Sequence, residues 1–153
     1  MIDRFVRFSF SISEIYRYWH QIMSSEMEKY GLKSSCGIYL ISLKHDPEGV
    51  TAARLAEITG RDKADVSRSV TELEKKGFLR KEGVRYRALL FLTEEGEKVA
   101  LNLCARAASA VEAGGRGLSE EQRIVFYEKL EQIASNLKEL SRDGIPENKP
   151  SEK

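Results

Sequence analysis

Apolar residues recur at steps of three and four along both ends of the chain, which is the spacing of one face of an α-helix. This pattern covers residues 1–30, where Gly31 follows as the expected C-cap. It covers residues 94–142 with one Gly-Gly-Arg-Gly interruption, after which Ser119 and Gln122 have the spacing of a capping box. The sequence therefore predicts long helices at both ends.

Three shorter helical patterns lie between these ends. The first covers residues 38–43, and Thr51 then stands as N-cap of the second, which Gly60 ends. Asp62 is the N-cap expected for the third helix, which Gly77 stops. Its inward face is formed by Val66, Val70 and Leu73. Two helices joined across a glycine-containing turn predict a helix-turn-helix.

The period changes after Gly77. Residues 78–81 and 86–92 alternate like strands, and residues 82–85 separate them. This predicts a β-hairpin with a tight tip, placed as a wing beside the preceding helix.

The element order predicts a mainly α fold with a small β-hairpin wing, which is a winged helix-turn-helix. We expect a single domain over residues 1–145 that contains a reader unit at residues 51–92. Residues 146–153 have no periodicity and predict a disordered tail.

The apolar faces of the terminal helices are larger than the reader unit can cover. Exposing them to water would be costly, so we expect a homodimer formed by residues 1–30 and 94–142. The residues expected at its interface are Phe5, Phe8, Ile12, Ile15, Phe126, Leu130, Ile133, Leu137 and Leu140. A monomer in which the terminal helices cover one another is the alternative.

Composition and motifs exclude several classes of protein. A hydrophobic content of 41% and a charged content of 32% fit a globular chain, and the longest uncharged run, Ser34–Leu43, is too short to span a membrane. Cys36 and Cys104 form no C-x-x-C pair, which favours a reducing cytoplasm. His20 and His45 lie on different predicted elements, and no catalytic motif accompanies them. We therefore predict no enzymatic activity, no metal site and no required cofactor.

Charge is concentrated in the middle of the chain. Residues 54–87 carry ten basic and six acidic groups, whereas residues 88–153 carry nine basic and twelve acidic groups. Such a basic centre is expected of a segment that meets a polyanion. It predicts binding of double-stranded DNA by the reader unit. The alternative is a winged helix that binds protein and carries its charge incidentally.

The candidate DNA contacts lie on the third short helix and on the hairpin. On the helix they are Lys63, Ala64, Asp65, Ser67, Arg68, Thr71 and Lys75. Small side chains beside an arginine suit the major groove, where Arg68 can grip a guanine or hold a phosphate. On the wing and its flank they are Arg54, Lys81, Arg85 and Arg87. Arginines at a hairpin tip can enter a narrow minor groove.

Four segments together resemble the MarR family of bacterial winged-helix regulators. They are Thr-Ala-Ala-Arg-Leu-Ala-Glu-Ile at 51–58, Asp-Lys-Ala-Asp-Val-Ser-Arg-Ser-Val at 62–70, Leu-Glu-Lys-Lys-Gly-Phe-Leu-Arg at 73–80 and Leu-Thr-Glu-Glu-Gly at 92–96. The resemblance implies a homodimer with intertwined terminal helices, two wings that flank a pseudo-palindromic operator, and a repressor released by a small ligand or an oxidant.

By position, the resemblance assigns Lys63, Ser67 and Arg68 to the recognition helix and Arg87 to the wing arginine. Two departures from the family pattern bear on DNA binding. Arg85 stands where the family usually has an aspartate that braces the wing arginine, on a wing several residues shorter than usual. Asp65 stands where the family often has Ser or Thr; it would repel phosphates but could accept a hydrogen bond from a cytosine amino group.

The family commonly binds aromatic acids between the dimer helices and the reader unit. The residues that could border such a cavity here are Trp19, His20, Met23, Cys36 and Tyr39. Their alternative role is ordinary core packing. Cys36, near the start of a helix, is also a candidate oxidant sensor. Family members that sense oxidants, however, place the reactive cysteine nearer the N-terminus.

Overall fold

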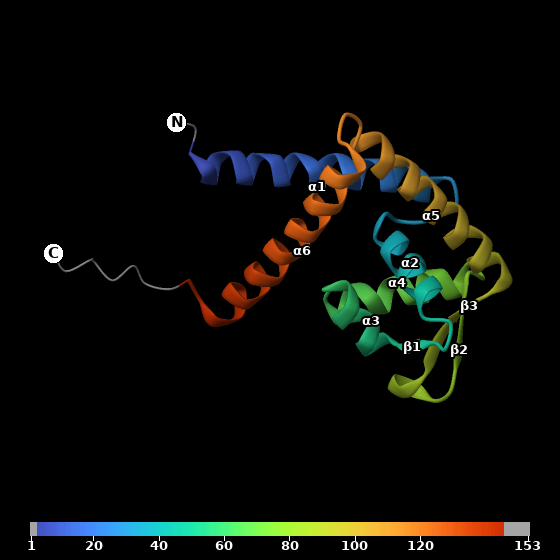
Figure 1. The fold of residues 1–153 in the computed structure, drawn as a ribbon. Helices are drawn as coiled ribbons and strands as arrows, with labels where there is room; N and C mark the ends of the chain where they lie inside the picture. Colours follow the sequence, from blue (N-terminus) through green and yellow to red (C-terminus); the bar gives the residue numbers. More distant parts are fainter. Residues whose placement is uncertain (1–2, 146–153) are drawn as a thin grey trace. The chain divides into compact units, whose positions relative to one another are not determined.

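The computed structural model describes residues 3–145 and is mainly helical, with one small antiparallel sheet (Figure 1). In chain order the elements are α1 (Arg4–Glu28), α2 (Ser35–His45), β1 (Val50–Thr51), α3 (Ala52–Thr59), α4 (Lys63–Lys75), β2 (Leu79–Glu82), the 3₁₀ turn η1 (Arg85–Arg87), β3 (Leu89–Leu92), α5 (Glu94–Gly114) and α6 (Glu120–Asp143). The predicted winged helix-turn-helix is confirmed. The predicted tail, residues 146–153, lies outside the described residues. No helix among residues 3–145 is long and apolar enough to cross a membrane.

The chain divides into two compact units. The first, Met1–Ala110, contains α1 to α4, the sheet and most of α5. The second, Val111–Lys153, contains the end of α5 and all of α6. The whole reader unit therefore belongs to the first compact unit.

The helix-turn-helix begins and ends where the sequence predicts. The Thr51 hydroxyl accepts a hydrogen bond from a backbone N–H in the first turn of α3, and Gly60 ends that helix in the left-handed region at φ +63°. The Asp62 carboxylate accepts two backbone N–H bonds, of 2.7 and 3.0 Å, at the start of α4. Gly77, at φ +77°, follows α4. These residues fix the length of the recognition helix at both ends.

The sheet has three strands in the order β1-β3-β2, and all neighbours are antiparallel. Val50 pairs with Leu90, and Leu79 pairs with Leu92. The sequence pattern predicts only the β2–β3 hairpin. Strand β1 is not visible in the sequence because two residues are too few to show a period of two.

The predicted tight tip of the hairpin is wrong. The strand expected from residue 86 begins only at Leu89, and the last paired position joins Glu82 to Leu89. Residues 83–88 form the tip instead, because Arg85 adopts a left-handed φ of +53° and a backbone bond of 3.1 Å runs from Ala88 to Arg85. This 3₁₀ turn places Arg85 and Arg87 on a loop rather than on a strand.

One hydrophobic core lies within the first unit. It joins the C-terminal end of α1 to α2, α3, α4, the sheet and α5. The predicted inward face of α4 is confirmed, with Val66 and Leu73 fully buried and Val70 nearly so. Side chains with no more than 2% exposure include Met27, Cys36, Tyr39, Leu40, Leu55, Leu79, Leu90, Ala100 and Leu103.

A buried carboxylate ties α1 to α5 within this unit. Glu26 is 6% exposed and contacts Lys29 Nζ at 2.6 Å and Arg106 Nε at 3.2 Å. The hydrogen bond from Lys29, with help from Arg106, holds the pKa of Glu26 below its ordinary value in spite of burial. The carboxylate is therefore charged and paired at neutral pH.

Within the second unit, α6 starts with the capping box that the sequence predicts. The Ser119 hydroxyl accepts from the Gln122 N–H, and the Gln122 side chain accepts from the Ser119 N–H. Arg123 pairs with Glu112 and also donates to the Gly115 carbonyl at 3.2 Å. These contacts fix the turn from α5 into α6.

Candidate nucleic-acid interface

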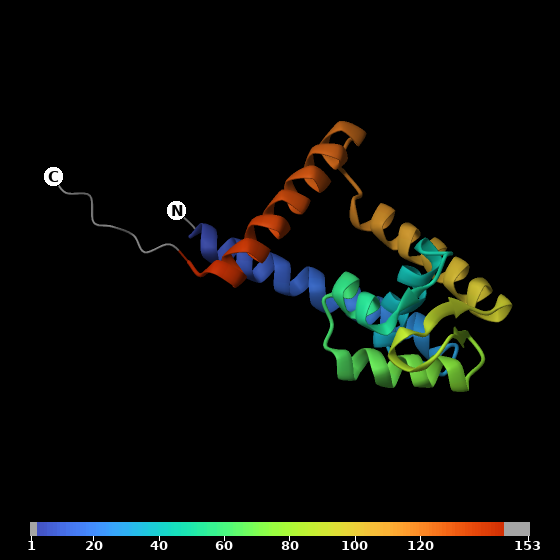
Figure 2. The same ribbon diagram turned by 90° about the horizontal axis from the view of Figure 1, so that it is seen from below.

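The outer face of α4 is an open, cationic helix surface. Figure 2 shows α4 along one edge of the first unit. The predicted contacts Lys63, Ala64, Ser67, Arg68, Thr71 and Lys75 are all exposed there. A shallow hollow on the same face is lined by Lys33, Ser67, Arg68, Thr71, Glu72 and Lys75. The small residues lie beside an arginine whose side chain is 66% exposed, which is the arrangement expected for entry into a groove.

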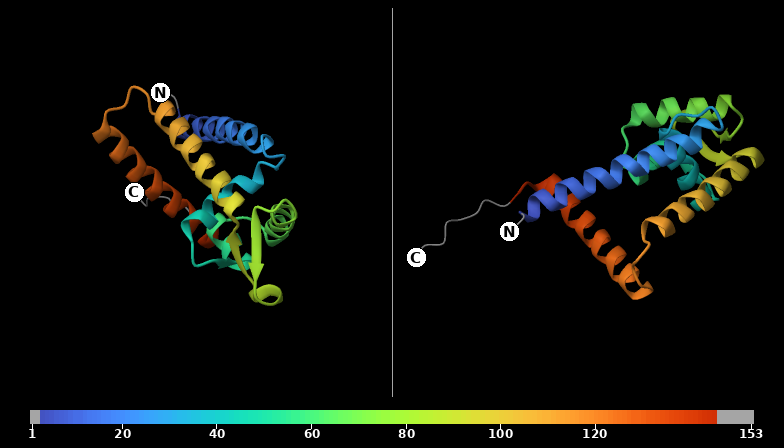
Figure 3. Two further views of the ribbon diagram at one scale, coloured as in Figure 1. Left: turned by 90° about the vertical axis from the view of Figure 1, so that its right-hand side faces the viewer. Right: turned by 90° about the horizontal axis from the view of Figure 1, so that it is seen from above.

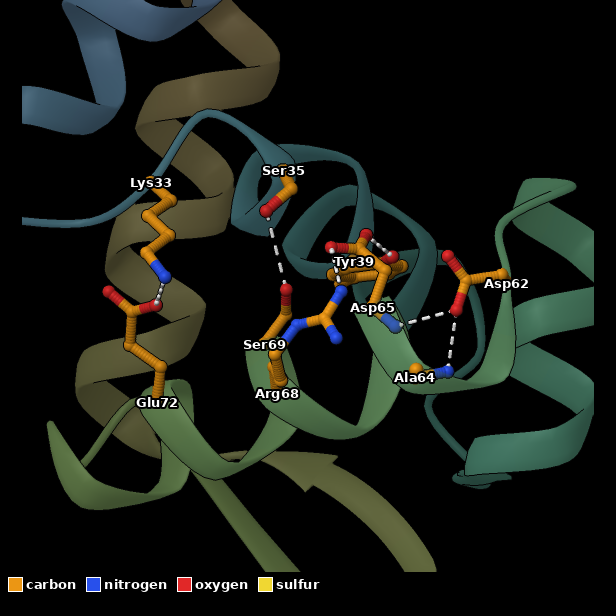
Figure 4. A network of polar contacts seen from close by, with 9 residues as sticks. All are labelled: Lys33, Ser35, Tyr39, Asp62, Ala64, Asp65, Arg68, Ser69 and Glu72. Carbon is orange, nitrogen blue, oxygen red and sulfur yellow. Dashed lines mark hydrogen bonds and ion pairs between the residues drawn. The ribbon is translucent and has the colours of Figure 1, made fainter.

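Asp65, in contrast, faces the protein. Its Oδ2 atom accepts a hydrogen bond of 2.6 Å from the Tyr39 hydroxyl of α2, and its Oδ1 atom lies 3.8 Å from a guanidinium nitrogen of Arg68 (Figure 4). Burial above all, and then the bond to Asp65, raise the pKa of Tyr39 well above its ordinary value. The phenol therefore keeps its proton and acts as the donor. This geometry differs from the expectation that Asp65 accepts from a base.

Two further polar contacts lie between α4 and residues 33–35, at the start of α2. Ser69 is 2% exposed and its Oγ lies 3.3 Å from Ser35 Oγ. Glu72 Oε2 lies 4.0 Å from Lys33 Nζ. Together with Asp65 these residues follow the helical spacing of four and three, so they share one side of α4. Sequence reasoning missed the contacts because their partners are distant along the chain, although the spacing on α4 was visible.

The wing carries its free cations at the tip. Figure 3 shows the tip of the hairpin extending away from the helices of the first unit. Arg85 and Arg87 are exposed there and have no ion-pair partner among residues 3–145. Lys81, which was also predicted to contact DNA, lies 2.5 Å from Glu74 of α4. This ion pair fixes the base of the wing to the recognition helix.

Two arginines of the wing and its flank, Arg54 of α3 and Arg80 of β2, are engaged by other side chains. Arg54 is exposed, but it donates a 2.8 Å hydrogen bond to Glu57 one turn along α3. Arg80 pairs with Glu82 and stacks 4.6 Å above the ring of Phe91. Among the described cations of the wing and α3, Arg85 and Arg87 at the tip have no ion-pair partner, whereas those lower on the wing and on α3 are paired.

Comparison with known proteins identifies this architecture. The model of the MarR family matches residues 30–88, which covers α2 through the wing tip. Residues 30–88 therefore match the winged helix of the MarR family. A Bacillus subtilis (strain 168) protein named as an uncharacterized HTH-type transcriptional regulator, YybA, is 26% identical over 129 residues, which is 82% of this chain and 85% of that protein.

Solved structures agree with the MarR assignment at the level of the fold. A MarR transcriptional regulator from Methanosarcina mazei Go1 has a TM-score of 0.82 at 23% identity, over 92% of this chain and 94% of the other. A Listeria monocytogenes protein assigned to the MarR transcriptional regulators, solved with 26mer DNA, has a TM-score of 0.81 at 21% identity, over 97% of this chain and 100% of the other. The relatives of this MarR-type winged helix are thus transcriptional regulators.

A second feature of the chain is a cavity of about 390 Å³ in the first unit. Its lining comprises Tyr16, Trp19, His20, Met23, Ser34, Ser35, Gly37, Ile38, Ile41 and Arg61. Three of the five predicted residues, Trp19, His20 and Met23, therefore line it. Cys36 and Tyr39 do not, because they occupy the opposite side of α2 and are fully buried in the core. Arg61, just after Gly60, is a lining residue that sequence reasoning missed.

Cys36 does not have the surroundings of an oxidant sensor. Burial, followed by the charge of Glu72, raises the pKa of its thiol to about 11. The thiolate is the reactive form, so Cys36 is held unreactive at neutral pH. Among residues 3–145, no three His, Cys, Asp or Glu side chains are grouped to hold a metal ion.

Of the nine residues expected at a dimer interface, all except the partly buried Leu130 are exposed in the single chain. On α1 the exposed fraction is 72% for Phe5 and 58% for Ile15, and on α6 it is 44% for Phe126 and 47% for Leu137. No described residue of α6 is buried. Both helices thus keep apolar faces without a partner inside their own unit.

Proposed function

We propose that this chain is a sequence-specific transcriptional regulator that binds double-stranded DNA as a homodimer on a pseudo-palindromic operator. The observation that carries the proposal is the outer face of α4, where exposed small residues flank Arg68 beside a wing tip with two free arginines. Supporting it is the Listeria monocytogenes neighbour, which was solved with DNA. The exposed apolar faces of α1 and α6 supply the surface for pairing two chains.

The mechanism is steric repression in the cytoplasm, at the nucleoid. Two copies of α4 occupy successive major grooves, with half-sites about 34 Å apart, and the wings contact the flanking minor grooves. A bound dimer excludes polymerase from the promoter. Nothing in this mechanism calls for a cofactor or for catalysis.

We propose further that a small aromatic ligand relieves repression by binding in the cavity. Trp19 and Ile38 offer it apolar surface, whereas His20 and Arg61 offer polar groups. A ligand that changes the separation of the two reader units weakens binding to an operator of fixed spacing. Fluorescence titration of Trp19, the only tryptophan of the chain, tests ligand entry directly.

The test of DNA binding is selection from a pool of duplexes with a randomised centre, followed by gel shifts over a range of salt concentrations. Arg68→Ala should cost about 1–3 kcal/mol on the selected sequence and reduce base preference. Arg87→Ala should weaken binding on all sequences and reduce the salt slope. Arg17→Ala, which removes an exposed arginine of α1, is the matched control and should change neither.

Two outcomes refute the proposal. Equal and sequence-independent losses for Arg68→Ala and Arg87→Ala would disprove their separate roles. Absence of any salt-sensitive retardation would instead favour the alternative, in which the winged helix is a protein-interaction module without specific DNA binding.

A further inference from the structure

We propose that Tyr39 is a positioning residue for sequence reading: its hydroxyl holds the Asp65 carboxylate inward, and that carboxylate steers the guanidinium of Arg68. The proposal rests on the DNA-binding function above. It assigns a role in specificity to a residue that is fully buried and cannot itself contact DNA.

The carboxylate is divided between its two neighbours. Oδ2 is engaged by the Tyr39 hydroxyl at 2.6 Å, which leaves Oδ1 as the atom that faces Arg68 (Figure 4). The distance from Oδ1 to the guanidinium nitrogen is 3.8 Å, too long for a hydrogen bond. Oδ1 therefore attracts Arg68 without capturing it, and the arginine keeps its donors available for a base or phosphate.

Without the tyrosine hydroxyl, Asp65 would behave differently. Its side chain is 26% exposed, so it can turn towards solvent. Turned outward, it can form a full ion pair with Arg68 three residues along the helix, and it adds negative charge to the face that approaches phosphates. The ion pair would occupy the hydrogen-bond donors of Arg68, and the added negative charge would weaken the attraction between α4 and the DNA phosphates.

The hydroxyl is held in place by the surroundings of α2. The ring of Tyr39 belongs to the hydrophobic core, so the phenol cannot follow Asp65 outward. The contact between Ser35 Oγ and Ser69 Oγ, at 3.3 Å, joins α2 to the same side of α4 one turn further along. The position of the donor is thus set by the packing of α2 against α4, which is the kind of support that keeps a binding side chain in one geometry.

The decisive variant is Tyr39→Phe, which removes only the hydroxyl. Tyr30→Phe is its matched control, since the Tyr30 hydroxyl also takes part in a 2.6 Å side-chain bond, but its partner is Asn102 of α5 and not a residue of α4. Full-length wild type and both variants are put through selection from the same randomised duplex pool. We expect Tyr39→Phe to discriminate between the selected sequence and its single-base variants at least about fivefold less well, the lower end of the effect of losing a base-reading arginine. Tyr30→Phe should select as wild type does.

A second variant separates positioning from a merely structural role. In Asp65→Ala the carboxylate is absent, so adding Tyr39→Phe should change base discrimination no further, although it can still lower the melting temperature. Independent losses of discrimination in the double variant would overturn the proposal, as would unchanged discrimination in Tyr39→Phe. If the wild type selects no sequence at all, the DNA-binding function itself is refuted. If the wild type selects a sequence and Tyr39→Phe discriminates equally well, only the role of Tyr39 is refuted.

Discussion

Gly96 stands where α5 meets the wing, and no larger residue fits there. Its N–H donates to the Thr93 hydroxyl at 3.1 Å, and Thr93 in turn donates its N–H to the Phe78 carbonyl at 3.2 Å. A Cβ atom at position 96 would lie 1.9 Å from the Phe78 oxygen and 2.8 Å from its carbonyl carbon. Gly96→Ala therefore forces two backbones apart, because no side chain can turn away to relieve the contact.

The size of the effect follows from that geometry. Overpacking a core costs about 1–3 kcal/mol when side chains can adjust. A clash between backbone segments lies at the upper end of this range or above it, so we expect Gly96→Ala to lower the free energy of unfolding by about 3 kcal/mol. Because Phe78 leads directly into β2, the same strain displaces the wing. DNA affinity should fall together with stability.

The matched control is Gly114→Ala at the other end of the same helix. A Cβ atom at position 114 would meet no atom within 4 Å, and the φ of Gly114 is not in the left-handed region. The substitution should raise stability by about 0.5 kcal/mol through helix propensity. Urea unfolding at one fixed protein concentration measures both variants. A loss of less than about 1 kcal/mol for Gly96→Ala, the bottom of the overpacking range, would refute the argument.

Three other predictions concern reactivity, capping and assembly. Iodoacetamide at pH 7.5, which is about one unit below an ordinary thiol pKa, should label the partly exposed Cys104. It should not label the buried Cys36, whose thiol stays protonated. Peptide mass spectrometry after labelling distinguishes the two cysteines. Two backbone N–H bonds lower the pKa of Asp62, so its contribution to stability is present above about pH 4 and lost as pH falls. Asp62→Ala should therefore lower the melting temperature at neutral pH and much less in acid; an equal shift at both pH values contradicts this. Ile133→Glu should yield single chains in light scattering, whereas a persistent dimer would place the interface elsewhere.

Local signals in the sequence were enough to predict the starts of α3, α4 and α6, but not the end of α1, whose C-cap is Lys29 instead of Gly31, or the bounds of α2 (Ser35–His45). Thr51, Asp62 and Ser119 cap their helices through hydrogen bonds to residues two or three positions away, so the sequence contains both partners. The exposed residues of α4 could be predicted from its buried ones, because the helical period of 3.6 residues assigns each position of the helix to one face or the other. The DNA contacts themselves stay predictions.

Longer-range features could not be predicted in this way. The side-chain partner of Asp65 is 26 residues away along the chain, on a helix whose packing direction no periodicity reveals. Cys36 and Tyr39 lie on the core side of α2. The sequence could not predict this, because α2 is apolar nearly all round and therefore has no amphipathic pattern that shows which side faces the core. The wing tip was misjudged because the apolar run after residue 86 looks extended, whereas the left-handed Arg85 breaks it.

The two sides of α2 have different tasks: Ile38 and Ile41 line the cavity, whereas Tyr39 holds Asp65. Eleven residues of one rigid helix thus carry both functions, and neither side can be remodelled without shifting the other. Under the functions proposed here, the specificity for the small ligand and the specificity for the operator sequence evolve together. A descendant that evolves to bind a different small molecule is expected to bind a different set of promoters as well. Paralogues that differ at Ile38 or Ile41 should therefore also differ in the genes they regulate.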